Sequence, residues 1–197
     1  MSALPDRTST ARALLVPADA VRVVGAVSVG VAVLWFDGVA VALMLLVLGG
    51  LMVPRALGTP GRLDVAYGAA LLVAAWSGVV GLYERIPWWD LVVHFVVTGL
   101  VSAMAYLLTV RLEVARDPAD AVSGAHRWGV VMLTTSLGLG LSVLWELGEW
   151  LGHTYVDESI YVTEVDTLGD LAAGGLGALL AGHALVTLVR RAAYTRP

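Results

Sequence analysis

Residues 89–110 read WDLVVHFVVTGLVSAMAYLLTV, and this stretch indicates what kind of protein the chain forms. At about 1.5 Å per residue, an α-helix of this length crosses a hydrocarbon core about 30 Å thick. Similar apolar runs recur along the 197-residue chain, which is 58% hydrophobic and 14% charged. A soluble domain of this size carries fewer apolar residues. We therefore expect an all-α fold, a polytopic transmembrane helical bundle.

The apolar runs are separated by short segments that contain glycine, proline or charged residues. We expect one membrane domain over residues 1–197 with about six spans. The expected spans are residues 20–36, 38–53, 63–83, 89–110, 127–151 and 166–189.

The basic residues predict how these spans are oriented. All twelve are arginines, and eleven lie at the N-terminus, in the second and fourth loops or at the C-terminus, Arg85 being the exception. Because cytoplasmic loops are enriched in Lys and Arg, we expect both termini in the cytoplasm and the first, third and fifth loops outside. Trp35, Trp88 and Trp150 lie near the expected outer ends, as is typical of residues at a membrane interface.

Charge and cysteine content exclude several classes of function. The formal net charge is −4, and no basic cluster beyond Arg190–Arg191 offers a nucleic acid a binding surface. With no cysteine, the chain has no disulfide framework, no thiolate metal site and no cysteine nucleophile. The partner that the composition predicts is the lipid bilayer, and the oligomeric state is left open.

Each of the last three expected spans carries ionisable residues on one face, starting at its outer end. Residues three or four apart share a helix face, and charged residues in a membrane normally face the protein interior. We therefore expect the three faces to meet about one helical turn below the outer interface. The residues are Asp90 and His94 in the fourth span, Glu146, Glu149 and His153 in the fifth, and Asp166 and Asp170 in the sixth.

Such a cluster needs compensation, because two carboxylates 4 Å apart repel by about 4 kcal/mol at an effective dielectric near 20. A divalent metal ion, protonation of the acids, or Arg85 are the three candidates. Carboxylates with imidazoles suit zinc, manganese or iron, whereas carboxylates with water suit magnesium or calcium. The candidate metal ligands are Asp90, His94, Glu146, Glu149, Asp166 and Asp170. The candidate catalytic residues are His94, Glu146 and Glu149, with a spare carboxylate as general base.

Simpler structural interpretations compete with these roles. Asp90 and Asp166 each open an expected helix and are interpreted as N-caps when taken alone, and Asp37 and Asp64 flank spans in the same way. His183 points away from the acidic face of the sixth span and is expected to be structural.

The motifs of the last three spans resemble those of the YjdF-like family of small bacterial inner-membrane proteins, and more distantly those of VanZ-like proteins. Some VanZ-like proteins are associated with glycopeptide-antibiotic resistance. VanZ-like proteins usually have lysine at the position of Leu91 and often glutamine at the position of Glu149, so these differences favour the YjdF-like family. The resemblance covers Trp88 to about Gly182 and implies a multi-pass protein of the bacterial inner membrane, without implying a particular reaction. The matching motifs are Trp89-Asp90, His94-Phe95, Trp145-Glu146, Glu149-Trp150, Asp166-Thr167, Asp170 and Gly177-Ala178.

Three functions are compatible with the sequence. The first is a metal-dependent enzyme or ligand-binding site that acts on a lipid headgroup or a lipid-linked envelope precursor. The second is a small transporter or proton-coupled permease that uses the carboxylates for coupling. The third is a non-catalytic membrane scaffold in which the acids are structural.

Overall fold

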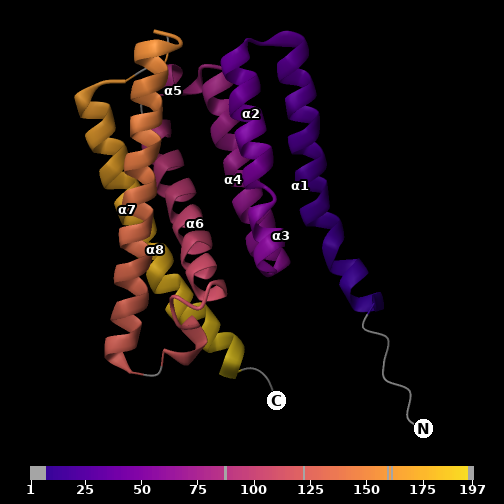
Figure 1. Cartoon of the computed structure of the whole chain (residues 1–197), viewed down its shortest axis with the longest axis vertical. Helices are drawn as coiled ribbons and strands as arrows, with labels where there is room; N and C mark the ends of the chain where they lie inside the picture. The colour runs from indigo at the N-terminus through magenta and orange to yellow at the C-terminus, as the bar shows by residue number, and fades with distance from the viewer. Residues whose placement is uncertain (1–7, 87, 122, 159, 161, 195–197) are drawn as a thin grey trace. The chain divides into compact units, whose positions relative to one another are not determined.

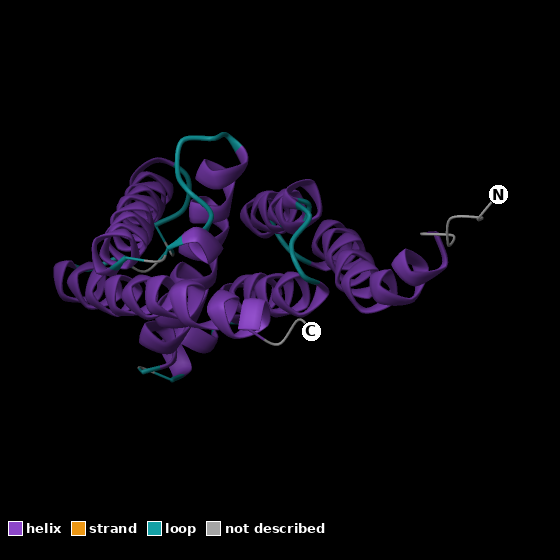
Figure 2. Ribbon diagram, turned by 90° about the horizontal axis from the view of Figure 1, so that it is seen from below, coloured by secondary structure: helices purple, strands orange, loops and turns teal. Residues whose placement is uncertain are grey.

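Helices form every regular element in the part of the chain that the structure describes (Figure 1). The structure is a computed structural model, and it describes residues 8–86, 88–121, 123–158, 160 and 162–194. Between the helices the described residues form loops and turns (Figure 2). The prediction of an all-α membrane protein is therefore confirmed. The chain divides into two compact units, Met1–Val79 and Val80–Pro197.

The first unit has an apolar core that holds its long helices together. Met44 and Leu51, each 1% exposed, lie at the centre of this core. The carboxylate of Asp37 accepts a hydrogen bond of 2.8 Å from the backbone N–H of Ala40, which confirms the predicted cap at the start of the second helix. The helices are α1 (Thr8–Trp35), α2 (Gly38–Gly50), α3 (Val53–Leu57) and α4 (Gly61–Val79).

Asp64 is not a helix cap, and that prediction is wrong. Its two carboxylate oxygens accept hydrogen bonds of 3.0 and 2.8 Å from Arg22 of α1. Both side chains are nearly buried, with 11% and 12% of their surface exposed. Arg22 therefore lies within a helix and neutralises a buried acid, although the sequence groups it with the N-terminal arginines.

The second unit is built on three long helices that lie side by side (Figure 1). Ser123 caps the second of these helices by accepting a hydrogen bond of 3.2 Å from the backbone N–H of His126. Because the helices alternate in direction, the start of α6, the end of α7 and the start of α8 meet at one end of the unit. The elements are α5 (Leu82–Arg85), α6 (Trp89–Arg111), η1 (Pro118–Asp120), α7 (Gly124–Tyr155) and α8 (Glu164–Tyr194).

Small residues allow α6, α7 and α8 to approach closely. A Cβ atom added to Gly99 would lie 2.9 Å from the carbonyl oxygen of Gly177, and one added to Gly177 would overlap the carbonyl group of Phe95. Gly138 of α7 packs in the same way against Ala178 and Ser102. These contacts bring the helix backbones together, as small residues do in membrane helix pairs.

Among the described residues, five stretches are long and apolar enough to cross a membrane: Pro17–Trp35, Gly38–Leu57, Trp89–Arg111, Gly124–Tyr155 and Glu164–Leu188. The expected span at residues 63–83 corresponds to α4, which is not among the five. This helix ends at Val79, and Gly81 (φ 65°) in the left-handed region separates it from α5. The count of six spans and the cytoplasmic location of both termini therefore stay predictions.

Large apolar side chains are exposed on the long helices of both units. Leu34 is 70% exposed, Leu46 62%, Leu144 64% and Leu168 67%. Such apolar surfaces are unfavourable in water and favourable in lipid. The helix backbone also tolerates lipid, because every backbone polar group inside a helix is already hydrogen-bonded. The bilayer is accordingly the environment of these helices.

Candidate metal centre

His94 lies among three carboxylates that come from α6, α7 and α8. Its Nε2 atom is 3.4 Å from Oδ1 of Asp90 and 4.0 Å from Oδ2 of Asp170, and its Nδ1 atom is 3.8 Å from Oε1 of Glu146. The side chain of His94 is 10% exposed, and those of Glu146 and Asp170 are 7% and 3% exposed. The three polar faces predicted from residue spacing therefore meet at the end of the unit where α6 and α8 begin.

Two overlapping groups of side chains have the composition and spacing of a metal-binding site. One group is Asp90, His94 and Asp170, and the other is His94, Glu146 and Glu149. Within each group the potential ligand atoms all lie within 4.8 Å of one another. His94 belongs to both groups, so it connects the acids of α7 with those of α6 and α8.

Two carboxylate oxygens of this cluster are buried without a hydrogen-bond partner in the described structure, Oε1 of Glu146 and Oδ1 of Asp170. A buried polar atom without a partner is costly, and the cost is larger for a charged group. Arg85, the cation that the sequence suggested as compensation, is exposed and forms no ion pair with any residue that the structure describes. A divalent cation beside Glu146 would satisfy Oε1 directly and would offset the negative charge of the neighbouring Asp170.

Asp90 and Asp166 do not cap their helices, and both N-cap interpretations are wrong. The N-cap position of α6 is Trp88, which makes no side-chain cap, and Asp90 lies within the first turn, where its carboxylate faces His94. In α8 the capping group is the hydroxyl of Thr163, which accepts a hydrogen bond of 3.2 Å from the backbone N–H of Asp166. The carboxylates of both acids are therefore available for other contacts.

The remaining candidates lie outside the two metal-binding groups. Asp166 is half-buried in the first turn of α8 and is not a member of either group. His153 belongs to α7, and its Nδ1 atom donates a hydrogen bond of 2.6 Å to the carbonyl oxygen of Ile160, so it holds the chain that follows the helix. His183 donates from Nδ1 to the carbonyl oxygen of Leu179 and packs edge-on against Trp128, which confirms its structural role.

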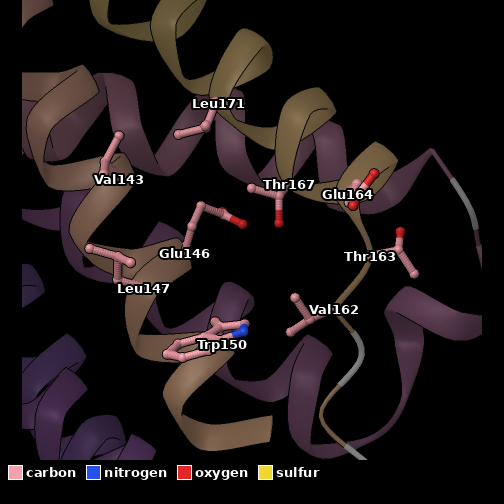
Figure 3. Close-up of a pocket in the computed structure, with 9 residues that line it drawn as sticks. All are labelled: Val143, Glu146, Leu147, Trp150, Val162, Thr163, Glu164, Thr167 and Leu171. Atoms are coloured by element: carbon pink, nitrogen blue, oxygen red, sulfur yellow. The ribbon is translucent and has the colours of Figure 1, made fainter. Parts of the chain in front are cut away.

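A pocket of about 430 Å³ lies beside the cluster, between α7 and the first turns of α8 (Figure 3). Glu146 lines this pocket as well as the metal-binding group, and its carboxylate points toward Thr167 (Figure 3). Thr167 was not predicted from the sequence as a site residue, and Trp150, another lining residue, was expected at the membrane interface. The spacing of three residues between Thr167 and Asp170 is the signal that places Thr167 on the acidic side of the helix.

Fold and cluster together define an integral membrane protein with a buried group of histidine and acidic side chains. Residues 11–192 match the model of a family described as "Predicted membrane protein (DUF2238)". The match covers nearly the whole chain, and the chain belongs to this family. Comparisons with curated proteins and with solved structures found no match.

Proposed function

We propose that α6, α7 and α8 bind a divalent metal ion beside His94, and that the site acts on the headgroup of a lipid or of a lipid-linked envelope precursor. The observation that carries this proposal is the position of His94 in two groups of potential ligands. Each group includes one buried carboxylate oxygen without a hydrogen-bond partner in the described structure, Oε1 of Glu146 in one and Oδ1 of Asp170 in the other. Imidazole with carboxylates is a ligand set that suits zinc, manganese or iron.

Nδ1 of His94, together with Glu146 and Glu149, would hold the ion. A histidine that binds a metal through one nitrogen usually donates its other N–H to a carboxylate, which fixes the orientation of the ring. Asp90 is placed for that second role, since its Oδ1 is the carboxylate oxygen nearest to Nε2. Asp170 also lies on the Nε2 side of the ring. Asp166 belongs to neither group and adds negative charge at the start of α8.

When bound, the ion would polarise a phosphoryl or carbonyl oxygen of the substrate. Glu149 is half-buried, whereas Glu146 is buried, so Glu149 is the acid nearer to solvent. If Glu149 holds the ion through one carboxylate oxygen, its other oxygen can accept a proton from an attacking water molecule as general base. By holding the ion, His94 and Glu146 would position the phosphoryl or carbonyl group of the substrate.

The lipid substrate and the cellular location are parts of the same proposal. The cluster lies at one end of three membrane helices, where a molecule with one end in lipid and the other in water can reach it. The family match supports the YjdF-like assignment and a membrane location. The bacterial inner membrane follows from the resemblance alone, and we place the cluster on its outer side. The arginine distribution supports the same orientation.

The packing beneath the cluster favours a site at one end over a transport path through the bundle. The backbones of Gly99 and Gly177 are so close that even a methyl group on either glycine would collide with the opposite helix. Thr98 and Ser142, one turn below the cluster, are buried against Gly174 in the same packed interior. Proteoliposomes should accordingly show no proton movement that depends on Asp170.

Metal analysis of purified protein tests the proposal. We expect stoichiometric metal in the wild type and its loss in His94→Ala and Glu146→Ala. Glu84→Gln is the matched control, because Glu84 is an exposed acid at the same end of the unit and belongs to neither metal-binding group. Wild-type protein without metal, after purification and after incubation with zinc or manganese, would contradict the proposal and favour the scaffold. Loss of metal in Glu84→Gln would show that metal binding depends on the total negative charge at this end of the unit and not on His94 and Glu146 as ligands.

A further inference from the structure

The pocket between α7 and α8 shares a wall with the metal centre but has a different chemical character. Apolar side chains form most of its lining, among them Val143, Leu147 and Leu171. Its polar groups include Glu146 and Thr167, which face each other across the space (Figure 3). The volume of about 430 Å³ lies within the range of pockets that hold small organic ligands.

We infer that this pocket binds a membrane phospholipid, with the first part of one acyl chain among the apolar side chains and the phosphate directed toward Glu146. The inference rests on the proposed function, because it takes the metal ion beside His94 as the partner of the phosphate. It adds the place where the substrate binds and the chemical class to which the substrate belongs.

The surroundings of the pocket indicate an occupant that comes from the bilayer. Leu144 and Leu151 lie three and four residues from Leu147 on α7, and Leu168 lies three residues from Leu171 on α8. These leucines are 64%, 48% and 67% exposed. Residues at these spacings are neighbours on a helix surface, so the lining of the pocket continues into the lipid-facing surface of both helices. An acyl chain can therefore enter sideways without leaving apolar surroundings.

The charges of the pocket indicate an anionic headgroup that is held through a cation. Glu146 and Glu164 both line the pocket, and alone they would repel a phosphate. A divalent ion between Glu146 and the phosphate reverses this effect, since phosphate oxygens are hard ligands of such ions. Buried Oε1 of Glu146, which lacks a hydrogen-bond partner in the described structure, is the atom that this arrangement would satisfy. Headgroup binding should then depend on metal, whereas chain binding should not.

Photocrosslinking in phosphatidylcholine nanodiscs tests the inference. The probes are a phosphatidylglycerol with a diazirine near the start of one acyl chain and a diacylglycerol with the same chain. We expect the phosphatidylglycerol probe to label peptides that contain Leu147 and Leu171, and EDTA to reduce this labelling severalfold. Labelling by the diacylglycerol probe should be weaker and insensitive to EDTA, because it has no phosphate.

Pocket-filling variants provide the second measurement. In Leu171→Trp, and independently in Val143→Trp, we expect labelling to fall by about tenfold, because the indole excludes at least two methylene groups of the chain. Leu180→Trp is the matched control, because Leu180 is a 58% exposed leucine on the same helix, nine residues from Leu171 and outside the pocket lining, and this variant should label like the wild type. Retention of metal by all three variants shows that they are folded.

The possible results separate this inference from the proposed function. Labelling spread evenly along α7 and α8, or equal labelling of Leu171→Trp and Leu180→Trp, would overturn the pocket assignment while leaving the metal site in place. Pocket labelling that EDTA does not change, in protein shown to contain metal, would overturn the assignment of the phosphate to the metal. Pocket labelling in a wild type without metal would overturn the proposed function and the phosphate assignment together.

Discussion

The Nδ1 atom of His94 lies 3.8 Å from Oε1 of Glu146, and this contact joins α6 to α7 at the end of the second unit. Because the Nε2 atom of the same ring faces Asp90 and Asp170, the two sides of one imidazole meet acids from three helices. A single ion would be bound by one ring nitrogen, and the hydrogen bond from the other nitrogen to a carboxylate would fix the orientation of the ring. The two sides should therefore respond differently to substitution.

We predict that Glu146→Gln lowers metal affinity by more than about 100-fold, whereas Asp90→Asn lowers it by about 10- to 100-fold. The first change removes a proposed ligand, and the second removes the carboxylate that orients the ligating ring. Competition with a chromophoric chelator measures both affinities. A larger loss in Asp90→Asn than in Glu146→Gln would place the ion on the Nε2 side, between Asp90 and Asp170.

Chelation should destabilise the wild-type protein. An ion present at 100 times its dissociation constant contributes about 2.7 kcal/mol to stability, because it binds the folded state alone. We expect EDTA to lower the thermal midpoint of the wild type in detergent and to leave that of Glu146→Ala unchanged. An equal effect of EDTA on both proteins would indicate a metal bound elsewhere.

The stabilisation by metal should fade as the pH falls. Imidazole and carboxylate ligands bind metal in their deprotonated forms, so protons compete with the ion and its affinity decreases toward acidic pH. Between about pH 7.5 and about pH 5, the difference in thermal midpoint with and without EDTA should therefore shrink. Glu84→Gln should follow the wild-type profile. A difference that grows at low pH would contradict metal binding by His94.

Residue spacing predicted much of this site, because helical periodicity is a local property. Asp90 and His94 are four residues apart, as are Asp166 and Asp170, and this spacing fixes which side chains share a face. Charged faces of membrane helices are expected to turn inward, and from this the contact between the acidic faces of the three helices at His94 was predicted correctly. Asp166 failed to join either group because it lies one helical turn, about 5.4 Å, nearer to the start of α8 than Asp170.

Features that depend on packing between distant segments could not be predicted in this way. Arg22 and Asp64 are 42 residues apart, and a rule that assigns arginines to cytoplasmic loops gives no sign that they pair. The pocket beside Glu146 depends on how α7 and α8 diverge, which no local pattern encodes. Helix caps were misassigned because the cap position depends on the residue at which the helix begins. α6 begins at Trp89, with Trp88 at its N-cap position, so Asp90 already lies within the first turn.

The buried ion pair of the first unit should contribute strongly to stability. Asp64→Ala removes both hydrogen bonds of buried Arg22 to Asp64 and leaves only the partly exposed carboxylate of Asp19, 3.5 Å away, and breaking a buried pair costs about 3–5 kcal/mol in comparable cases. Arg55→Ala is the control, because Arg55 pairs with Asp19 through side chains that are 53% and 44% exposed, and such pairs contribute about 0–1 kcal/mol. Unfolding by SDS titration in mixed micelles measures the difference. Equal effects of the two variants would contradict the importance of burial.

The close contact between α6 and α8 should be intolerant of a single methyl group. In Gly177→Ala the new Cβ atom would overlap the carbonyl group of Phe95, a backbone group that cannot rotate away, so the helices must separate. Overpacking of this kind typically costs about 1–3 kcal/mol, and here it also displaces His94 relative to Asp170, two turns from Gly177 along α8.

Gly140→Ala is the matched control for this change. A Cβ atom at Gly140 meets nothing within 4 Å in the described structure, and alanine favours a helix over glycine by about 0.5–1 kcal/mol. We expect Gly140→Ala to unfold at the same or a slightly higher SDS fraction than the wild type and to retain its metal. Gly177→Ala should unfold earlier and bind metal more weakly. If Gly177→Ala kept wild-type stability and metal affinity, the packing of α6 against α8 would not be what positions the cluster.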